Sequence, residues 1–390
     1  MSASAILALA FVTGAPTTPS TTPDPNLIEL VRKLGHKSYR TREDAARELL
    51  RRGSEAVAAL NEGTKDADPE VSERCKQLLP QAASLERNEN IAKLTRDLKS
   101  PPPKGLAGVE RFLKITGDDK VARELYAEML AVHYRTLEAA ETEPRKATEQ
   151  FRQFCDDAYN RYQASIRTGR YNYDTMFSTR ADITFFLFIS SDLRVRKNDG
   201  GNSRSSILFS GNQITKAITD GDSAPAMRKV FLDWLENEPQ SYLQQRGFQL
   251  ASQANLKEAL PVALKLLEKP GQQTYGQAQV MIALAKLGSK EHIPLLEKYL
   301  DDKTNIGSVG FGNGITMSIQ MRDVAMGVSA QLAGQKLQDF GFDTRFGGVP
   351  TSYIYYGFPQ EMDGKESKAR DEAHAKWKKW ASENLSKPKK

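Results

Sequence analysis

The chain has 390 residues, of which 39% are hydrophobic and 27% are charged. This composition excludes a disordered protein, because it supplies enough apolar side chains for a core. The net charge of +6 is modest, and its excess lies in residues 365–390, so the remainder is close to neutral. No basic face across the body is indicated, and there is no specific signal for nucleic-acid binding.

The N-terminal segment predicts export. Residues 1–15 contain an apolar run and a small-residue cleavage site, as in a signal peptide, although no Lys or Arg precedes the run. Residues 16–24 form a Pro/Thr-rich linker. The apolar run is too short to span a bilayer, and no other segment approaches the roughly 18 apolar residues required. We expect a periplasmic or cell-envelope protein without a transmembrane helix, and a cytoplasmic location as the alternative.

Residues 25–80 predict short helices separated by a glycine and an acidic turn. Thr41 and Asp44 have the spacing of a capping box. Gly53 suits the left-handed conformation that ends a helix. Residues 68–70 (Asp-Pro-Glu) supply a cap, a first-turn proline and a negative charge at the start of the next helix.

This cadence resembles the HEAT-like family of helical repeats. The residues that carry the resemblance are Arg42, Ala45, Leu49, Gly53, Ala56, Leu60, Asp68, Pro69, Glu70, Val71 and Arg74. The resemblance implies an α-solenoid, a fold that presents an extended surface to partners. It also implies structural roles for Arg42, Asp68 and Arg74, which would tie neighbouring repeats together.

The middle of the chain is helical but has lost the repeat register. Residues 81–104 predict a polar helix and a Pro-rich connection, and residues 105–239 a central helical section. The almost continuous apolar run at residues 183–189 could form a buried strand. Its helical surroundings favour a fully buried helix instead. Cys75 and Cys155 fall on apolar helix faces, which predicts buried thiols and leaves a disulfide open.

The repeat pattern returns over residues 240–335, where Pro261 and Pro294 occupy equivalent places and residues 321–332 predict a further helix. Residues 336–390 then predict an aromatic, Gly-rich connection and a basic capping helix. Trp377 and Trp380 of that helix would dock on the last repeat. This tail also resembles that of exported bacterial HEAT-like proteins. We expect an all-α fold, an irregular α-solenoid of HEAT-like helix pairs with a central non-repeat section and a C-terminal cap.

The chain offers little recognisable chemistry. Its four histidines lack the spacing of metal ligands, and no nucleophile elbow occurs. Residues 307–314 superficially resemble a phosphate cradle, but neither a preceding strand nor a lysine entering the following helix is expected, so a flexible loop between repeats is predicted. No cofactor, metal or catalytic residue is indicated.

One polar and aromatic cluster is distinctive. It consists of Arg161, Arg167, Arg170, Tyr171 and Tyr173. Arginine and tyrosine are enriched at protein interfaces, and they also suit loop packing and cation–π contacts within a fold. We take the cluster as a candidate partner-binding site.

Three functions follow as hypotheses. The first is a non-catalytic protein-interaction or scaffold protein of the cell envelope, with protein partners. The second is an enzyme with an unrecognised site in the central section. The third is binding of a polyanion by the basic C-terminal tail.

Overall fold

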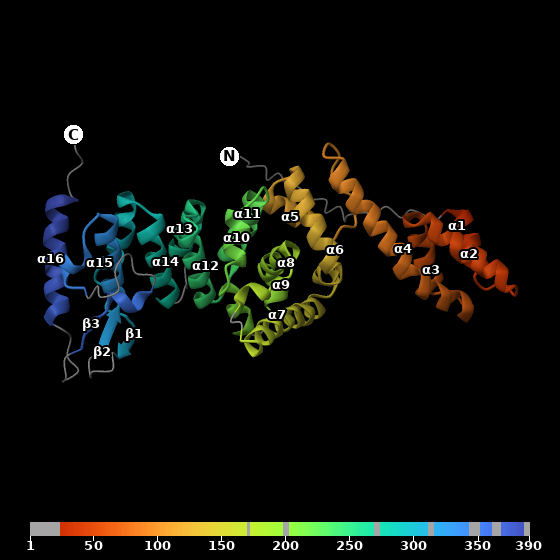
Figure 1. Cartoon of the computed structure of the whole chain (residues 1–390). Coiled ribbons are helices and arrows are strands. Elements are labelled where there is room, and N and C mark those ends of the chain that lie inside the picture. Colours follow the sequence, from red (N-terminus) through yellow and green to blue (C-terminus); the bar gives the residue numbers. More distant parts are fainter. Residues whose placement is uncertain are drawn as a thin grey trace, which may run out of the picture. The chain divides into compact units, whose positions relative to one another are not determined.

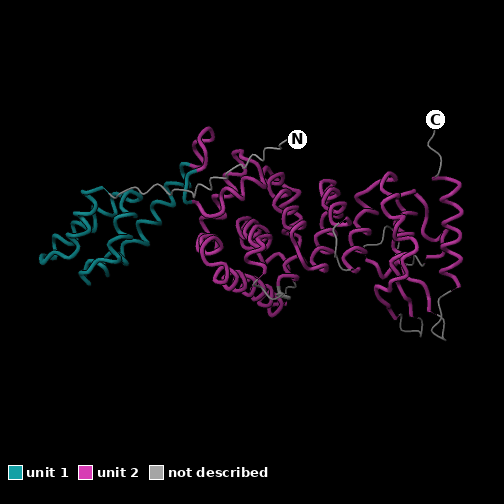
Figure 2. The backbone as a smooth tube through the Cα atoms, turned by 180° about the vertical axis from the view of Figure 1, so that it is seen from behind, with its two compact units in different colours: residues 1–93, 103–105 teal, residues 94–102, 106–390 magenta. Residues whose placement is uncertain are grey.

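The computed structural model describes residues 24–169, 172–197, 203–268, 274–310, 316–342, 352–360 and 368–385. Helices dominate these residues, beside a small three-stranded sheet, so the predicted all-α class is confirmed. The chain divides into unit 1 (residues 1–93 and 103–105) and unit 2 (residues 94–102 and 106–390), as Figure 2 shows. No helix in the described residues is long and apolar enough to cross a membrane.

Unit 1 is a helical block made of α1 (Pro25–Lys33), α2 (Tyr39–Arg52), α3 (Ser54–Gly63) and most of α4 (Pro69–Arg96), at the red end of Figure 1. Gly53 joins α2 to α3 with φ +53°, the positive φ that its position predicts. The capping box at Thr41 was a wrong prediction. Helix α2 already begins at Tyr39, with Ser38 as N-cap, so Thr41 lies inside it.

Helix α4 is longer than the sequence pattern indicates. The segment expected to form its own polar helix continues α4 through Pro80. Proline inside a helix removes one backbone hydrogen bond. Leu78 and Ala82 are buried on either side of Pro80 in the core of unit 1, and this packing offsets the lost bond. Cys75 is buried in the same core, and neither it nor Cys155 forms a disulfide.

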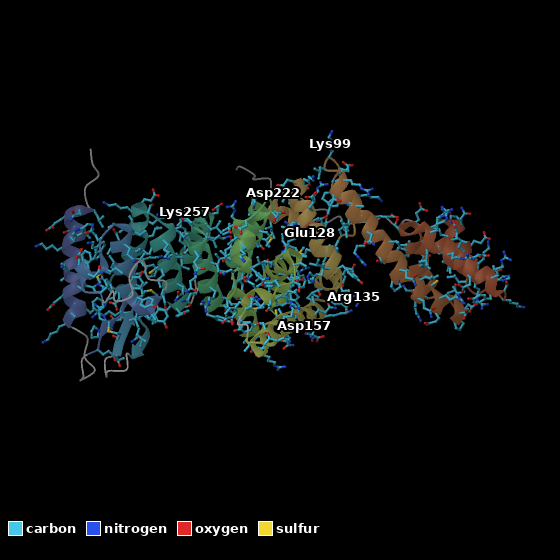
Figure 3. All side chains as sticks on the ribbon, in the orientation of Figure 1. Lys99, Glu128, Arg135, Asp157, Asp222 and Lys257 are labelled. Carbon is cyan, nitrogen blue, oxygen red and sulfur yellow. The ribbon has the colours of Figure 1, made fainter. Side chains whose placement is uncertain are left out.

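The first part of unit 2 surrounds one apolar helix. Its elements are α5 (Val109–Thr116), α6 (Lys120–Thr142), α7 (Pro144–Arg167), η1 (Tyr173–Thr175), α8 (Arg180–Ser190), α9 (Leu193–Arg196), η2 (Ser203–Phe209), α10 (Gln213–Thr219) and α11 (Ala224–Asn237). Figure 1 shows α8 within a ring of its neighbours, and Figure 3 shows side chains filling the space between them.

Helix α8 confirms the prediction of a buried helix at residues 183–189. Every residue from Ala181 to Ser190 is buried, as expected of a helix that is apolar on all sides. The ring centroid of Phe186 lies 6.0 Å from that of Phe151, 5.5 Å from that of Phe177 and 5.3 Å from that of Phe209. The aromatic side chains of α8 therefore connect α7 and the segments around η1 and η2.

The second part of unit 2 stacks helices in succession. It contains α12 (Ser241–Gln253), η3 (Lys257–Ala259), α13 (Leu260–Glu268), α14 (Thr274–Leu287), η4 (Lys290–Tyr299), α15 (Met321–Leu332), η5 (Leu337–Phe340), η6 (Tyr353–Tyr356) and α16 (Lys368–Asn384). Helix α12 packs on α14 and α14 on α15, while α13 packs on α14 and η4 on α15. The helix predicted at residues 321–332 is confirmed as α15. The HEAT-like register remains a prediction.

The flexible loop predicted at residues 307–314 was wrong where the structure describes it. Strand β1 (Asn305–Gly310) pairs antiparallel with β2 (Thr316–Gln320), and β2 pairs with β3 (Phe358–Pro359). Met317 and Ile319 of β2 are buried, which fixes the sheet to the helices. A Cβ at Gly307 would lie 2.9 Å from Cε2 of Tyr353, so glycine lets β1 pass close to this ring. Residues 311–314 lie outside the described residues.

The C-terminal helix is fixed by a buried ionic cluster. Asp323 of α15 accepts from Nε of Arg370 at 3.1 Å, and its other oxygen lies 3.1 Å from Nε2 of His374. All three side chains are buried. Trp377 is buried beside Phe340, with ring centroids 5.4 Å apart, so the predicted docking of this tryptophan is confirmed.

Candidate functional site

The structure describes three of the five residues of the predicted Arg/Tyr cluster. Arg161 serves the fold, since its Nε and Nη2 donate to the Met176 carbonyl at 3.1 and 2.5 Å. Arg167 is exposed in the last turn of α7. Tyr173 opens η1 and is 37% exposed. Arg170 and Tyr171 lie outside the described residues.

The segment around η1 is fastened at several points, which positions Tyr173. The backbone amide of Phe177 donates to Oε1 of Gln213 at 3.0 Å, and Nε2 of Gln213 donates back to the Phe177 carbonyl at 2.6 Å. Oδ1 of Asp174 accepts from the backbone amide of Asn212 at 3.0 Å. The Tyr173 ring stacks on Tyr162 of α7, with centroids 4.6 Å apart and planes 14° apart. One face of the Tyr173 ring is therefore held in place, while the residue remains 37% exposed.

Helix α12 supplies the opposite wall. Tyr242, Arg246, Gln249 and Gln253 recur at intervals of three or four residues and so share one face. The other face packs closely on α11 through Gly247. A Cβ at this position would lie 2.6 Å from Cδ1 of Leu235. Without a side chain at this position, the axis of α12 comes close to α11.

A buried carboxylate fixes the start of α12. Oε1 of Glu238 accepts from Nη2 of Arg196 and from the backbone amide of Gln240, both at 3.0 Å. Oε2 of Glu238 accepts from Nε1 of Trp234 at 3.1 Å. Burial raises the pKa of Glu238 above its usual value, although Arg196 opposes the shift. The carboxylate thus ties α9, α11 and the first turn of α12 together.

Between these walls lies a polar hollow of about 340 Å³, which we call the Tyr173–Arg246 pocket. It is lined by Tyr173, Phe209, Ser210, Gly211, Asn212, Arg246, Gln249, Leu250 and Gln253. Phe209 forms its apolar floor and continues into the core by stacking on Trp234, with centroids 4.5 Å apart. The other side chains are mainly hydroxyl and carboxamide groups around one guanidinium.

The described lining of this pocket carries an unbalanced positive charge. Among the described residues that line it, Arg246 is the one cation and none is acidic. Within the described residues, the only hydrogen bond of the Arg246 side chain is from Nη1 to Oε1 of Gln249 at 3.2 Å. The guanidinium therefore keeps donors for another acceptor.

In two other hollows, which are larger, cations lie beside carboxylates. In the hollow beside η1, Nζ of Lys216 lies 3.5 Å from Oδ2 of Asp174. In the hollow between α5 and α11, Nη2 of Arg111 lies 3.4 Å from Oδ2 of Asp233. A small hollow between α12 and α14 measures about 20 Å³, which is the space of a single water molecule. The Tyr173–Arg246 pocket is therefore the best candidate ligand site.

A histidine–aspartate pair lies elsewhere in unit 2. His133 interrupts the helical geometry of α6, and its Nε2 lies 2.9 Å from Oδ1 of Asp182. Burial raises the pKa of Asp182, but hydrogen bonds from His133 and from the backbone amides of Ser178 and Thr179 outweigh burial and hold it below its usual value. The His133 ring stacks on Phe185 at 4.0 Å. Because Asp182 also caps α8, the pair joins α6 to the start of that helix.

The predicted repeat residues lie in unit 1. Nη1 of Arg42 donates to the His36 carbonyl at 2.8 Å, and Nε of Arg42 lies 3.5 Å from Oε1 of Glu70. Arg74 donates to the same Glu70 oxygen at 2.6 Å. Asp68 accepts from the backbone amide of Glu70 at 2.9 Å, which caps α4. These contacts join α2 to α4, and the family role of the three residues stays a prediction.

The described residues contain no cluster of His, Cys, Asp and Glu that could hold a metal ion. No protein-family model and no curated protein matches the chain. The Tyr173–Arg246 pocket itself is what indicates a function. Sequence reasoning named Tyr173 and did not name Arg246, for which the available signal was the polar stripe of Tyr242, Arg246, Gln249 and Gln253 in residues 241–253.

Proposed function

We propose that this chain is a non-catalytic protein-binding protein, and that partners contact it at the Tyr173–Arg246 pocket and the adjoining face of α12. The observation that carries the proposal is the combination of two partly exposed tyrosines and an arginine on fixed elements. Tyr173 is 37% exposed and Tyr242 is 39% exposed, while Arg246 of α12 lines the pocket together with Tyr173.

This composition is that of an interaction hot spot. Tyrosine and arginine dominate the residues whose loss costs binding most, and such residues gather around pockets. The carboxamides of Gln249 and Gln253 both donate and accept hydrogen bonds, so they suit peptide groups of a partner. Hydrogen bonds fix the η1 segment, and the buried carboxylate of Glu238 fixes the start of α12. Little ordering would therefore be needed on binding.

The test is partner capture by the full chain and two variants. We expect Tyr173→Ala/Tyr242→Ala to lose proteins that the wild type captures from an envelope extract of the source cells. Each tyrosine should contribute about 1–2 kcal/mol. Tyr39→Ala is the matched control, since Tyr39 is 66% exposed and lies in unit 1. Capture that is the same for all three proteins would contradict the proposal, and so would its absence with the wild type.

The envelope location and scaffold role belong to the same proposal. They are supported by the signal-like residues 1–15 and the Pro/Thr-rich residues 16–24. Both segments lie outside the described residues, as do the last lysines of the tail. Fractionation of cells that carry the full chain tests the location directly, and recovery in the cytoplasm alone would contradict it.

A further inference from the structure

The Tyr173–Arg246 pocket has the donors to recognise an anion. The guanidinium of Arg246 presents several N–H groups in one plane, which match the two oxygens of a carboxylate. The side chains of Tyr173, Asn212 and Gln253 also reach the pocket, and each carries a neutral N–H or O–H donor. An anion there would meet donors from α12, from η1 and from the segment before α10.

The balance of charge favours a carboxylate over a phosphate group. A phosphorylated side chain carries close to two negative charges and is commonly bound by a cluster of arginines. The described lining of the pocket offers a single cation, Arg246, with neutral donors around it. The guanidinium of Arg246 therefore matches the single negative charge of a carboxylate. The second negative charge of a phosphate group would lose its water without gaining a cationic partner.

The pocket also has the size and setting for a side chain of a protein. Its volume of about 340 Å³ is at the small end of ligand sites, and it opens beside the exposed Tyr242 on the same face of α12. A bound carboxylate would leave its backbone next to the carboxamides of Gln249 and Gln253.

We propose that the Tyr173–Arg246 pocket binds the carboxylate of an aspartate or glutamate side chain in a partner protein. This inference rests on the proposed function and names the chemistry that its site selects. The guanidinium of Arg246 holds the carboxylate by paired hydrogen bonds. Tyr173, Asn212 and Gln253 surround it with neutral donors.

The experiment selects random heptapeptides on the immobilised full chain. It compares the wild type, Arg246→Gln and the control Arg228→Gln, whose Nη1 lies 3.9 Å from Oε1 of Glu258 away from the pocket. We expect Asp and Glu to be enriched among peptides selected by the wild type and by Arg228→Gln. Arg246→Gln should show no such enrichment. Arg246 is exposed, so this variant should fold normally.

A selected peptide and its Glu→Gln counterpart then give the affinity difference. The wild type should prefer the acidic peptide about tenfold or more, as expected of a charge-assisted hydrogen bond, and the preference should weaken at high salt. Arg246→Gln should bind both peptides alike. Inorganic phosphate should compete no better than acetate.

The outcomes separate the two proposals. Selected peptides without acidic enrichment, a preference that survives Arg246→Gln, or much stronger competition by phosphate would each overturn the carboxylate site. The protein-binding function would stand in those cases if Tyr173→Ala/Tyr242→Ala abolished selection. Failure of the wild type to select any peptide would overturn both.

Discussion

Replacing Arg370 by methionine should detach the C-terminal helix from α15. Arg370 is 1% exposed, and its Nη2 donates to the carbonyl and the Oγ of Ser318 at 2.8 and 2.7 Å. Its Nε donates to Asp323, which is 0% exposed. Methionine keeps an apolar stem but leaves the Asp323 carboxylate with His374 and the Gln320 amide as partners.

The size of the effect follows from these contacts. Removal of one partner of a buried ion pair costs about 3–5 kcal/mol. Two remaining partners of Asp323 reduce that cost, while the Ser318 groups that lose their donor add about 1 kcal/mol. We therefore expect a loss of about 3 kcal/mol. Arg370→Met/Asp323→Asn should recover part of it, because no unpaired buried charge remains.

Urea unfolding followed by tryptophan fluorescence provides the assay. The chain has three tryptophans, and Trp377 and Trp380 both lie on α16. The midpoint should fall by about 1 M urea for Arg370→Met. The control is Lys378→Met, also on α16, which removes an exposed ion pair between Lys378 and Asp301. This variant should change the urea midpoint little. Equal shifts for the two variants would refute the reasoning, because burial of the charge would then be irrelevant.

Three further changes test the interior of the molecule. Hydrogen bonds hold the folded pKa of Asp182 below its usual value, so its stabilisation is present above that usual value and is lost as the pH falls through the lowered pKa. Asp182→Asn should flatten this fall in thermal midpoint at acid pH, and an unchanged slope would contradict it. Burial raises the pKa of Cys75 to about 11, so its thiol should react with a disulfide reagent at pH 8 only after unfolding. Phe186→Ala should destabilise unit 2 by about 3–5 kcal/mol in urea unfolding, and a loss below 1 kcal/mol would contradict its central place.

The sequence predicts elements best where one physical signal acts alone. The apolar run at residues 183–189 had to be buried, and the helices predicted on both sides of it favoured a helix over a strand. The glycine-rich run at residues 307–314 led to a wrong prediction because glycine is depleted in strands and favours a loop. Pairing with β2 overrides that propensity, and β2 is itself fixed by burial of Met317 and Ile319.

Contacts between residues far apart in the sequence could not be predicted from a single chain. His133 contacts Asp182 and His374 contacts Asp323, in each case across about fifty residues of sequence. Neither spacing indicates from the sequence that the two side chains are in contact. The same holds for the candidate site. Tyr173 was visible because it stands in a local Arg/Tyr cluster, whereas Arg246 becomes meaningful only when α12 is placed opposite η1.

The position of the pocket joins two kinds of structure. Tyr173 comes from the central section, where the repeat pattern is lost, and Arg246 comes from the helix at which it resumes. A regular helix fixes the direction of its side chains through its own hydrogen bonds, but a segment such as η1 needs external ones. Gln213, Asn212 and Arg161 supply them. A loop that only connects two helices does not need so many hydrogen bonds to fix its conformation. A loop that presents a tyrosine ring opposite a guanidinium does need them, because a fixed ring loses less conformational entropy on binding.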